Sequence, residues 1–249
     1  MPVPALAADG VRKTFGAVAA LDGVTLAVAA GECVALVGES GSGKSTLLRA
    51  FNGLTTPDGG QVRVRGDDVG AQDAIGLRRH VGYVPQDGGL LPHWSVARNV
   101  ALVPWLLDRA DAGDAAAAAL DLVGLPPPQF AARWPHELSG GQRQRVAFAR
   151  ALAAGARTLL LDEPFGALDA ITRSDLQTMF LDLHRASGLT TLLVTHDLHE
   201  AALLADRVAV MRAGRIEQVD TPAALLAAPA TPYVQQLLER ARLTRRDLA

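Results

Sequence analysis

The segment that decides the fold is Gly38-Glu-Ser-Gly-Ser-Gly43-Lys44-Ser45, in which two glycines separated by four residues precede a lysine and a serine. It follows the apolar run Cys33 to Val37, which is typical of a strand covered on both faces. The residues from Lys44 to about Asn52 are typical of a helix. Because glycine adopts positive φ readily, the backbone of such a turn can present several N–H groups together. The segment therefore predicts a strand, a glycine-rich turn and a helix.

This arrangement is suited to binding phosphate groups, because clustered backbone N–H groups and the N-terminus of a helix attract anions. In a P-loop of this pattern, we expect Lys44 to contact the β- and γ-phosphates and the Ser45 hydroxyl to bind Mg²⁺. A chance match in a glycine-rich turn is the alternative, and the flanking strand and helix argue against it. The residues expected to bind the nucleotide here are Gly38, Glu39, Ser40, Gly41, Ser42, Gly43, Lys44, Ser45 and Thr46.

The composition limits the classes of function. Of the 249 residues, 49% are hydrophobic, and the net charge of -2 gives no electrostatic reason to expect a nucleic-acid partner. The single cysteine, Cys33, excludes an internal disulfide; we expect a buried core residue, with a reactive thiol as the alternative. The longest apolar candidate, Val100 to Leu107, is shorter than the roughly 20 residues that span a bilayer. Any work at a membrane would therefore require a partner.

The order of the expected elements indicates a nucleotide-binding α/β core interrupted by a helical insert. From about Leu91 to Gly155 the pattern is helical, and strands and helices alternate on both sides of this stretch. Further helices are expected from Ala170 to Ser187 and in a tail from Thr231. The expected strands are Ala5 to Ala8, Val24 to Val28, Cys33 to Val37, Gln61 to Arg65, Thr158 to Leu161, Thr190 to Thr195, Val208 to Arg212 and Ile216 to Val219.

A second anion-binding feature is predicted at Leu138-Ser-Gly-Gly-Gln142. Ser139 is a good N-cap for the helix that follows, and the two glycines leave backbone amides exposed at its start. An ordinary capped helix is the alternative. This segment resembles the signature sequence of the ATPases of the ATP-binding-cassette (ABC) family, and the resemblance extends from about Leu6 to Thr221. It implies ATP and Mg²⁺ as cofactors.

The other motifs of this family occur in the family's order. Thr158 to Glu163 resembles the Walker B strand, which implies that Asp162 binds Mg²⁺ through water and that Glu163 is the general base. Gln86 matches the Q-loop, which senses Mg²⁺ and the γ-phosphate. His196 matches the switch histidine, which implies hydrogen bonds to the γ-phosphate and to Glu163.

The resemblance also implies a head-to-tail dimer of two copies of the chain. In such a dimer each ATP lies between the P-loop of one copy and the signature of the other. The signature residues expected to face the nucleotide are Ser139, Gly140, Gly141 and Gln142. Asp169 matches the D-loop, which connects the two sites of the dimer.

Two of the expected roles have alternatives. Phe15 stands where the family places an aromatic ring that stacks on adenine, and a core aromatic is the other interpretation. His196 and His199 could also be two ligands of a metal ion, although no third ligand is apparent.

The fold class implied by the resemblance is α/β: a P-loop NTPase (RecA-like) core with an inserted α-helical subdomain and a small antiparallel β subdomain. One ABC ATPase domain is expected over residues 1–249. Within it, residues 1–90 and 156–225 would form the core and residues 91–155 the helical signature subdomain. Residues 226–249 would form a C-terminal helical tail.

Leu91 to Asn99 resembles the corresponding stretch of importers of osmolytes and polar amino acids. Glu163 to Asp169, followed by Ile171-Thr-Arg173, is similar to the importers of quaternary amines such as glycine betaine and choline. This likeness implies a peripheral ATPase at the cytoplasmic face of the cell membrane. Its partners would be an integral membrane permease and, indirectly, a solute-binding protein. Trp94 would line the groove for the permease or be a core residue. The alternatives are an importer of polar amino acids or another small solute, an exporter subunit, and an ABC ATPase that transports nothing.

Overall fold

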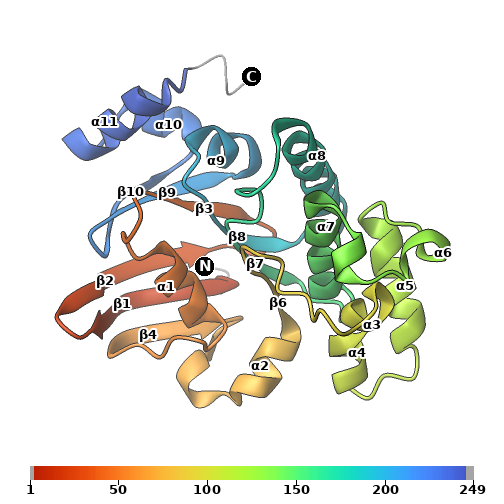
Figure 1. The fold of residues 1–249 in the computed structure, drawn as a ribbon. Helices are drawn as coiled ribbons and strands as arrows, with labels where there is room; N and C mark the ends of the chain where they lie inside the picture. The colour runs from red at the N-terminus through yellow and green to blue at the C-terminus, as the bar shows by residue number, and fades with distance from the viewer. Residues whose placement is uncertain (1–2, 245–249) are drawn as a thin grey trace. The chain divides into compact units, whose positions relative to one another are not determined.

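A computed structural model describes residues 3–244 of the chain (Figure 1). The chain divides into two compact units. The first unit consists of Met1–Leu77 and Leu189–Ala249, and the second consists of Arg78–Gly188. Within residues 3–244, no helix combines the length and the apolar character needed to cross a membrane.

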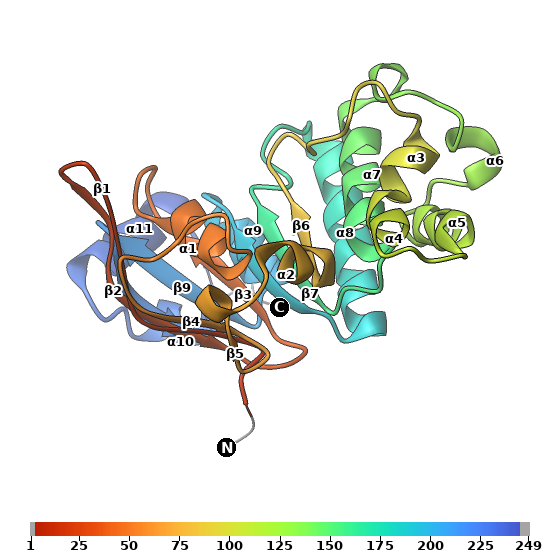
Figure 2. The same ribbon diagram turned by 90° about the horizontal axis from the view of Figure 1, so that it is seen from below.

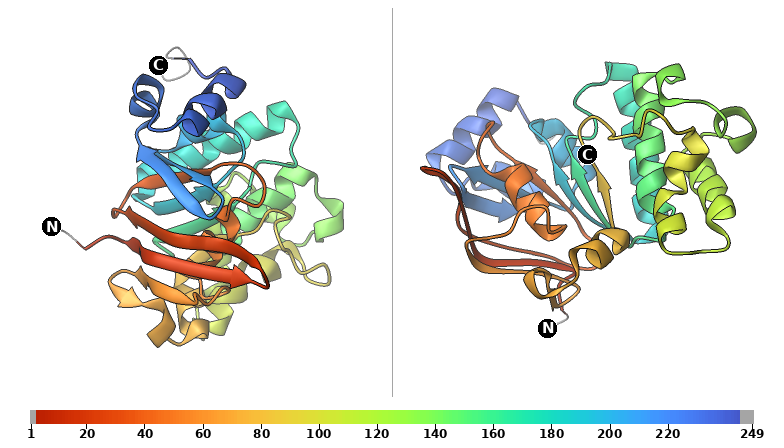
Figure 3. Two further views of the ribbon diagram at one scale, coloured as in Figure 1. Left: turned by 90° about the vertical axis from the view of Figure 1, so that its left-hand side faces the viewer. Right: turned by 60° about the horizontal axis from the view of Figure 1, so that its bottom comes forward.

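The first unit contains a four-stranded antiparallel sheet in the order β2-β1-β4-β5. Its strands are β1 (Leu6–Phe15), β2 (Val18–Val28), β4 (Gly59–Val64) and β5 (Asp67–Asp68). The hairpin of β1 and β2 is drawn in red in Figure 3. Leu6 pairs with Val28 on one side and Val64 on the other, and all three side chains are buried. The small antiparallel β subdomain of the predicted fold class is confirmed.

The first unit also contains parallel strands. β3 (Cys33–Val37) lies parallel to β8 (Thr190–Val194) and to β9 (Arg207–Arg212), and β10 (Arg215–Asp220) pairs antiparallel with β9. α1 (Lys44–Phe51) contacts β8, and α9 (Leu198–Leu204) contacts β3. Every residue of β3 and β8 is buried, as the apolar runs in the sequence predict. The chain continues from β10 into α10 (Pro222–Ala227) and α11 (Pro232–Ala241).

The second unit is mainly helical around the parallel pair β6 (Val81–Val84) and β7 (Thr158–Asp162). Its helices are α3 (Val96–Val100), α4 (Leu102–Leu106), α5 (Ala112–Leu122), α6 (Pro127–Phe130), α7 (Gly140–Leu152) and α8 (Ala170–Ser187). α7 and α8 run side by side (Figure 2). Three phenylalanine rings form a buried cluster with ring centroids 6.2 to 6.3 Å apart: Phe148 of α7, Phe165 in the loop before α8, and Phe180 of α8.

Several elements differ from the sequence prediction. β1 is longer than predicted, because a register shift between Asp9 and Arg12 lets the strand continue past Gly10. The prediction missed α2 (Ala74–His80), β6 and α10. These elements have four to seven residues, and β6 contains Gly82, so their patterns are weak.

The boundaries between the two compact units also differ from the subdomain boundaries that the sequence predicts. Contacts group β6, β7 and α8 with the helices of the second unit, whereas the sequence suggested boundaries at residues 91 and 155. The division into residues 1–90, 91–155, 156–225 and 226–249 stays a prediction.

Candidate functional site

The predicted site residues are divided between the two units. In the first unit lie Phe15, the P-loop residues 38–46, and His196. In the second unit lie Gln86, Ser139, Gly140, Gly141, Gln142, Asp162, Glu163 and Asp169. The structure gives the local geometry of each group within its own unit.

The P-loop connects β3 to α1 through backbone conformations that require glycine. Gly38 and Gly43 have φ of 147° and 104°. A Cβ atom on Gly38 would collide with the carbonyl oxygen of Met211, and one on Gly43 would collide with that of Ala20. Gly43 is the N-cap of α1, so the loop ends at the N-terminus of a helix, where the helix dipole attracts anions. The glycine-dependent turn and the helix N-terminus that the sequence predicts for the P-loop are both present.

Lys44, the first residue of α1, folds back over this loop. Its side chain is buried, and Nζ donates hydrogen bonds to the carbonyl oxygens of Gly38 at 2.8 Å and Glu39 at 2.9 Å. Ser42 Oγ lies 3.4 Å from the same nitrogen. These contacts hold the ammonium group beside the loop backbone, where an anionic ligand of the loop would be neutralised.

Phe15 ends β1 and is 54% exposed, with Lys13 Nζ 5.4 Å from the ring centroid. The interpretation of Phe15 as a core aromatic is therefore wrong. Stacking on adenine stays a prediction.

His196 lies in the exposed turn between β8 and α9. Thr195 Oγ1 accepts a hydrogen bond from the Asp197 backbone N–H at 3.0 Å, and Asp197 in turn caps α9 through the N–H groups of His199 and Glu200. The backbone on both sides of His196 is thus fixed. His199 Nε2 is hydrogen-bonded to the carbonyl oxygen of Ala241 at 2.7 Å. Over residues 3–244 no three His, Cys, Asp or Glu side chains group closely enough to hold a metal ion, which disfavours the metal interpretation of this pair.

In the second unit, β6 and β7 place two acidic side chains beside two polar partners. Asp162, the last residue of β7, is buried, and the Tyr83 hydroxyl donates to its Oδ2 at 3.4 Å. The Gln86 amide nitrogen donates to Glu163 Oε2 at 3.4 Å. Glu163 has φ of 49°, a left-handed conformation that costs a non-glycine residue free energy and often occurs at functional sites. The structure therefore brings Gln86, Asp162 and Glu163 together.

The signature segment begins α7 with a capping box. The Ser139 hydroxyl accepts from the Gln142 N–H at 3.2 Å, and the Gln142 side chain accepts from the Ser139 N–H at 3.0 Å. A Cβ atom on Gly141 would collide with the Cγ2 methyl of Thr172 on α8, so the two helix N-termini are packed closely. The expected N-cap role of Ser139 is confirmed.

Asp169 caps α8 in the same way. Its carboxylate accepts from the Thr172 N–H at 3.1 Å, and hydrogen bonds from the Thr172 side chain and backbone hold the pKa of Asp169 below its usual value. Arg173 donates to the carbonyl oxygens of Phe165 and Leu168 at 3.3 and 3.1 Å and so fixes the loop before α8. Sequence reasoning missed this role, because an arginine in the first turn of a helix has no distinctive pattern.

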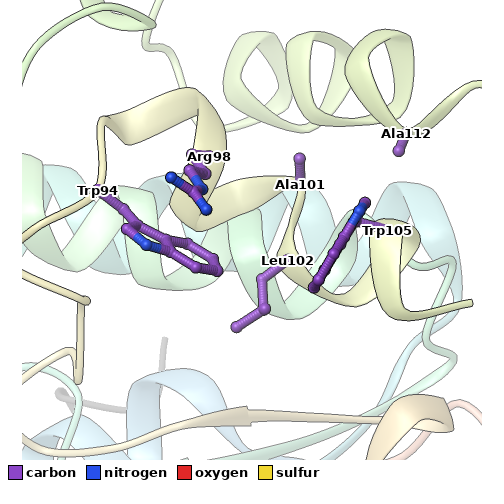
Figure 4. Close-up of a pocket in the computed structure, with 6 residues that line it drawn as sticks. All are labelled: Trp94, Arg98, Ala101, Leu102, Trp105 and Ala112. Carbon is purple, nitrogen blue, oxygen red and sulfur yellow. The ribbon is translucent and has the colours of Figure 1, made fainter.

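A pocket of about 250 Å³ lies among α3, α4 and α5 (Figure 4). It is lined by Trp94, Arg98, Ala101, Leu102, Trp105 and Ala112. Trp94 is partly exposed, with the Arg98 guanidinium 4.1 Å from its ring centroid, and Trp105 is 62% exposed. Trp94 is therefore not a core residue. The buried Asn99 amide donates to the carbonyl oxygens of Leu91, Trp94 and Ser95, which fixes the loop that leads to this pocket.

The comparison with protein families identifies the class of this chain. The profile of the family described as ABC transporter matches residues 21–166, which is more than half of the sequence. The chain therefore belongs to the ABC transporter family and contains its ATP-binding cassette.

Curated relatives show the same class. The choline transport ATP-binding protein OpuBA of Bacillus subtilis is 42% identical over 96% of this chain and 63% of its own length. The glycine betaine uptake system ATP-binding protein YehX of Escherichia coli is 44% identical over 94% of this chain and 76% of its own length. The sulfate/thiosulfate import ATP-binding protein CysA of Xanthomonas campestris is 50% identical over 90% of this chain and 66% of its own length. The chain spans less than two thirds of the length of OpuBA and CysA.

Among solved structures, the chain is similar to the ATP-binding cassette MJ0796 in a dimeric post-hydrolysis state bound to ADP and Pi. The identity is 31%, the TM-score is 0.77, and the match covers 87% of this chain and 98% of that one. The predicted α/β P-loop NTPase fold class is confirmed by this likeness.

Proposed function

We propose that this chain is the ATP-hydrolysing subunit of an ABC importer. The observation that best supports hydrolysis is the end of β7, where the buried Asp162 precedes Glu163, which has a left-handed backbone and Gln86 as a hydrogen-bond partner. A carboxylate that binds a metal ion and a second one that acts as a base are the groups that phosphoryl transfer to water requires.

In this proposal the nucleotide binds to the first unit through its phosphates and its base. Backbone N–H groups within residues 38–46 and the Lys44 ammonium contact the β- and γ-phosphates, and Phe15 stacks on adenine. The exposure of Phe15 and the three oxygen atoms around Lys44 Nζ support these roles.

The residues proposed to bind Mg²⁺ are Ser45, Gln86 and Asp162. Each offers an oxygen atom, and the Asp162 carboxylate is buried, which fits the preference of Mg²⁺ for oxygen ligands. When bound, the ion neutralises negative charge on the β- and γ-phosphate oxygens.

Hydrolysis transfers the γ-phosphoryl group to water. Glu163 removes a proton from the water, whose oxygen forms a bond to the γ-phosphorus as the bond to the bridging oxygen of ADP breaks. His196 orients the γ-phosphate and Glu163. The products are ADP and phosphate.

A second copy of the chain completes each site in this proposal. Ser139, Gly140, Gly141 and Gln142 at the start of α7 present backbone amides to the γ-phosphate bound by the other copy, and Asp169 connects the two sites. The dimeric state of the related cassette MJ0796 supports this arrangement.

The permease contact is proposed at the pocket of Trp94, Arg98 and Trp105. This pocket would bind a peptide segment that carries an apolar side chain and an acidic group. The exposed indole of Trp105 offers an apolar surface, and the Arg98 guanidinium in the same pocket offers a positive charge. The chain would then act as a peripheral protein at the cytoplasmic face of the cell membrane, with a solute-binding protein as an indirect partner.

We propose a quaternary amine such as glycine betaine or choline as the solute. OpuBA and YehX, which are named for choline and glycine betaine, match 94 to 96% of this chain. Sulfate is the alternative solute that the test must include, because the sulfate/thiosulfate import protein CysA is 50% identical to the chain.

The test starts with affinity purification of the chain from gently solubilised native membranes, with mass spectrometry of its partners. We expect a permease and a solute-binding protein. The recovered complex in liposomes should then hydrolyse ATP faster with glycine betaine or choline than with sulfate. Recovery of only soluble partners would overturn the transport proposal, and stimulation by sulfate alone would overturn the proposed solute.

A further inference from the structure

The C-terminal helix α11 contacts the P-loop through Tyr233. This residue lies in the first turn of α11, and its side chain is only 7% exposed. Its hydroxyl oxygen accepts a hydrogen bond from the backbone N–H of Glu39 at 3.4 Å. The Arg212 guanidinium lies 4.7 Å from the ring centroid, and this cation–π contact fixes the ring. A buried tyrosine of the C-terminal helix thus has its polar group on the phosphate loop.

Tyr233 and Lys44 bind opposite ends of one peptide group. The N–H of the peptide between Gly38 and Glu39 donates to the Tyr233 hydroxyl, and the C=O of the same peptide accepts from Lys44 Nζ at 2.8 Å. Because a peptide group is planar and rigid, a rotation that moves the N–H also moves the C=O. The orientation of this peptide therefore links Tyr233 to the position of the Lys44 ammonium.

Two further contacts hold α11 in place. Arg240 Nη1 lies 3.6 Å from Glu39 Oε1, although both side chains are about 60% exposed, so this ion pair is weak. At the end of the helix, the carbonyl oxygen of Ala241 is hydrogen-bonded to His199 Nε2 on α9. α9 begins directly after the turn that contains His196. α11 is thus tied both to the P-loop and to the helix that follows the proposed switch histidine.

We infer that Tyr233 is a positioning residue for the phosphate loop: it holds the peptide between Gly38 and Glu39 so that Lys44 meets the nucleotide phosphates. This role deepens the proposed function and rests on it, because it assigns Lys44 to the phosphates. The hydroxyl holds the loop in its binding conformation before the nucleotide arrives. Without the hydroxyl, the loop must become ordered on binding, and this ordering weakens the affinity for the nucleotide.

The test is Tyr233→Phe, which removes the hydroxyl and keeps the ring against Arg212. We expect the KM for ATP, and the Kd of a fluorescent ATP analogue, to rise about two- to tenfold, the range for one neutral hydrogen bond. kcat should remain unchanged, and the melting temperature should fall by no more than about a few degrees, the effect of one neutral hydrogen bond. A variant whose KM and Kd equal those of the wild type would overturn the inference.

Leu238→Ala is the matched control, because Leu238 lies on the same helix and is also 7% exposed. It removes apolar packing and leaves the Tyr233 hydroxyl, so we expect a lower melting temperature and an unchanged KM. An equal rise of KM in both variants would overturn the role of the hydroxyl. If the wild type binds the analogue without hydrolysing ATP, the proposed function fails while the Kd comparison still tests Tyr233.

Discussion

At the scale of single residues, Glu163 has the most demanding role in the proposed reaction. Its left-handed backbone and its contact with Gln86 fix a carboxylate at the end of β7. Glu163→Gln keeps the size of the side chain but cannot take a proton from water. We expect ATP hydrolysis to fall by at least about 100-fold, the usual contribution of a general base, with ATP affinity retained. Phosphate release and equilibrium binding of ATP measure the two effects.

Glu217→Gln is the control for this variant. Glu217 lies on β10 in the first unit, away from the Walker B strand in sequence, and is partly exposed. Its hydrolysis rate should match that of the wild type. Rapid turnover by Glu163→Gln would contradict the assignment of the base.

Lys44 is expected to act through charge. Its Nζ is surrounded by loop oxygen atoms, which keeps a buried cation in place for an anionic ligand. Lys44→Ala should weaken ATP binding by about tenfold or more, the effect of losing a charged hydrogen bond to phosphate. Calorimetric titration with ATP measures this loss. Arg215→Ala, which removes an exposed cation paired with Asp22, should leave the affinity unchanged, and an unchanged affinity in Lys44→Ala would contradict the P-loop role.

At the scale of elements, the close packing of α7 against α8 depends on Gly141. A Cβ atom there would collide with the Thr172 methyl group. Gly141→Ala should therefore lower the free energy of unfolding by about 1–3 kcal/mol, and adding Thr172→Ser, which removes only that methyl, should restore most of it. Urea unfolding followed by circular dichroism measures both values.

Gly140→Ala provides the matched control for this prediction. A Cβ atom at Gly140 would lie 3.6 Å from Leu168 Cδ2, an ordinary contact, so the free energy of unfolding should change little. Equal destabilisation by both alanine variants, or no rescue by Thr172→Ser, would contradict this prediction. It would show that the conformation of the helix start, and not the packing against α8, requires glycine at residue 141.

The sequence predicts elements that have a strong local pattern and misses those that do not. The apolar run of β3 and the capped helix α8 have the predicted bounds, Cys33–Val37 and Ala170–Ser187. β6 was missed because its four residues include Gly82. Gln86 and Glu163 could be selected from motifs, but their hydrogen bond depends on the pairing of β6 with β7, which no local pattern encodes.

At the scale of the whole molecule, contacts between distant parts of the sequence are the least predictable. Tyr233 lies 194 residues from Glu39, and only the folded chain brings α11 to the P-loop. The transported solute is harder still to predict from the sequence, because the relatives named for choline and for sulfate are 42% and 50% identical to this chain. The motifs therefore predict the cassette fold, whereas the proposed contact with a permease depends on surfaces such as the Trp94 pocket, which no motif marks.

The stability of the whole fold is expected to depend on the protonation of Cys33. This thiol is buried on β3, and burial, with the nearby charges of Asp206 and Glu32, raises its pKa well above the ordinary value. Above about pH 8.5 the unfolded chain releases this proton while the folded chain retains it. The contribution of the protonated Cys33 thiol to the free energy of unfolding is therefore complete below about pH 8.5. Above that pH it decreases by roughly 1.4 kcal/mol per pH unit.

Cys33→Ala isolates this effect, because the variant cannot titrate at that position. Urea unfolding of both proteins between pH 7 and 10 should give a constant difference in the free energy of unfolding below about pH 8.5 and a shift in favour of the variant above it. The native thiol should also resist alkylation until the protein unfolds, since the thiolate is the reactive form. Parallel stability curves over the whole range, or rapid alkylation of the native protein, would show that Cys33 is accessible to water and would contradict its place in the core.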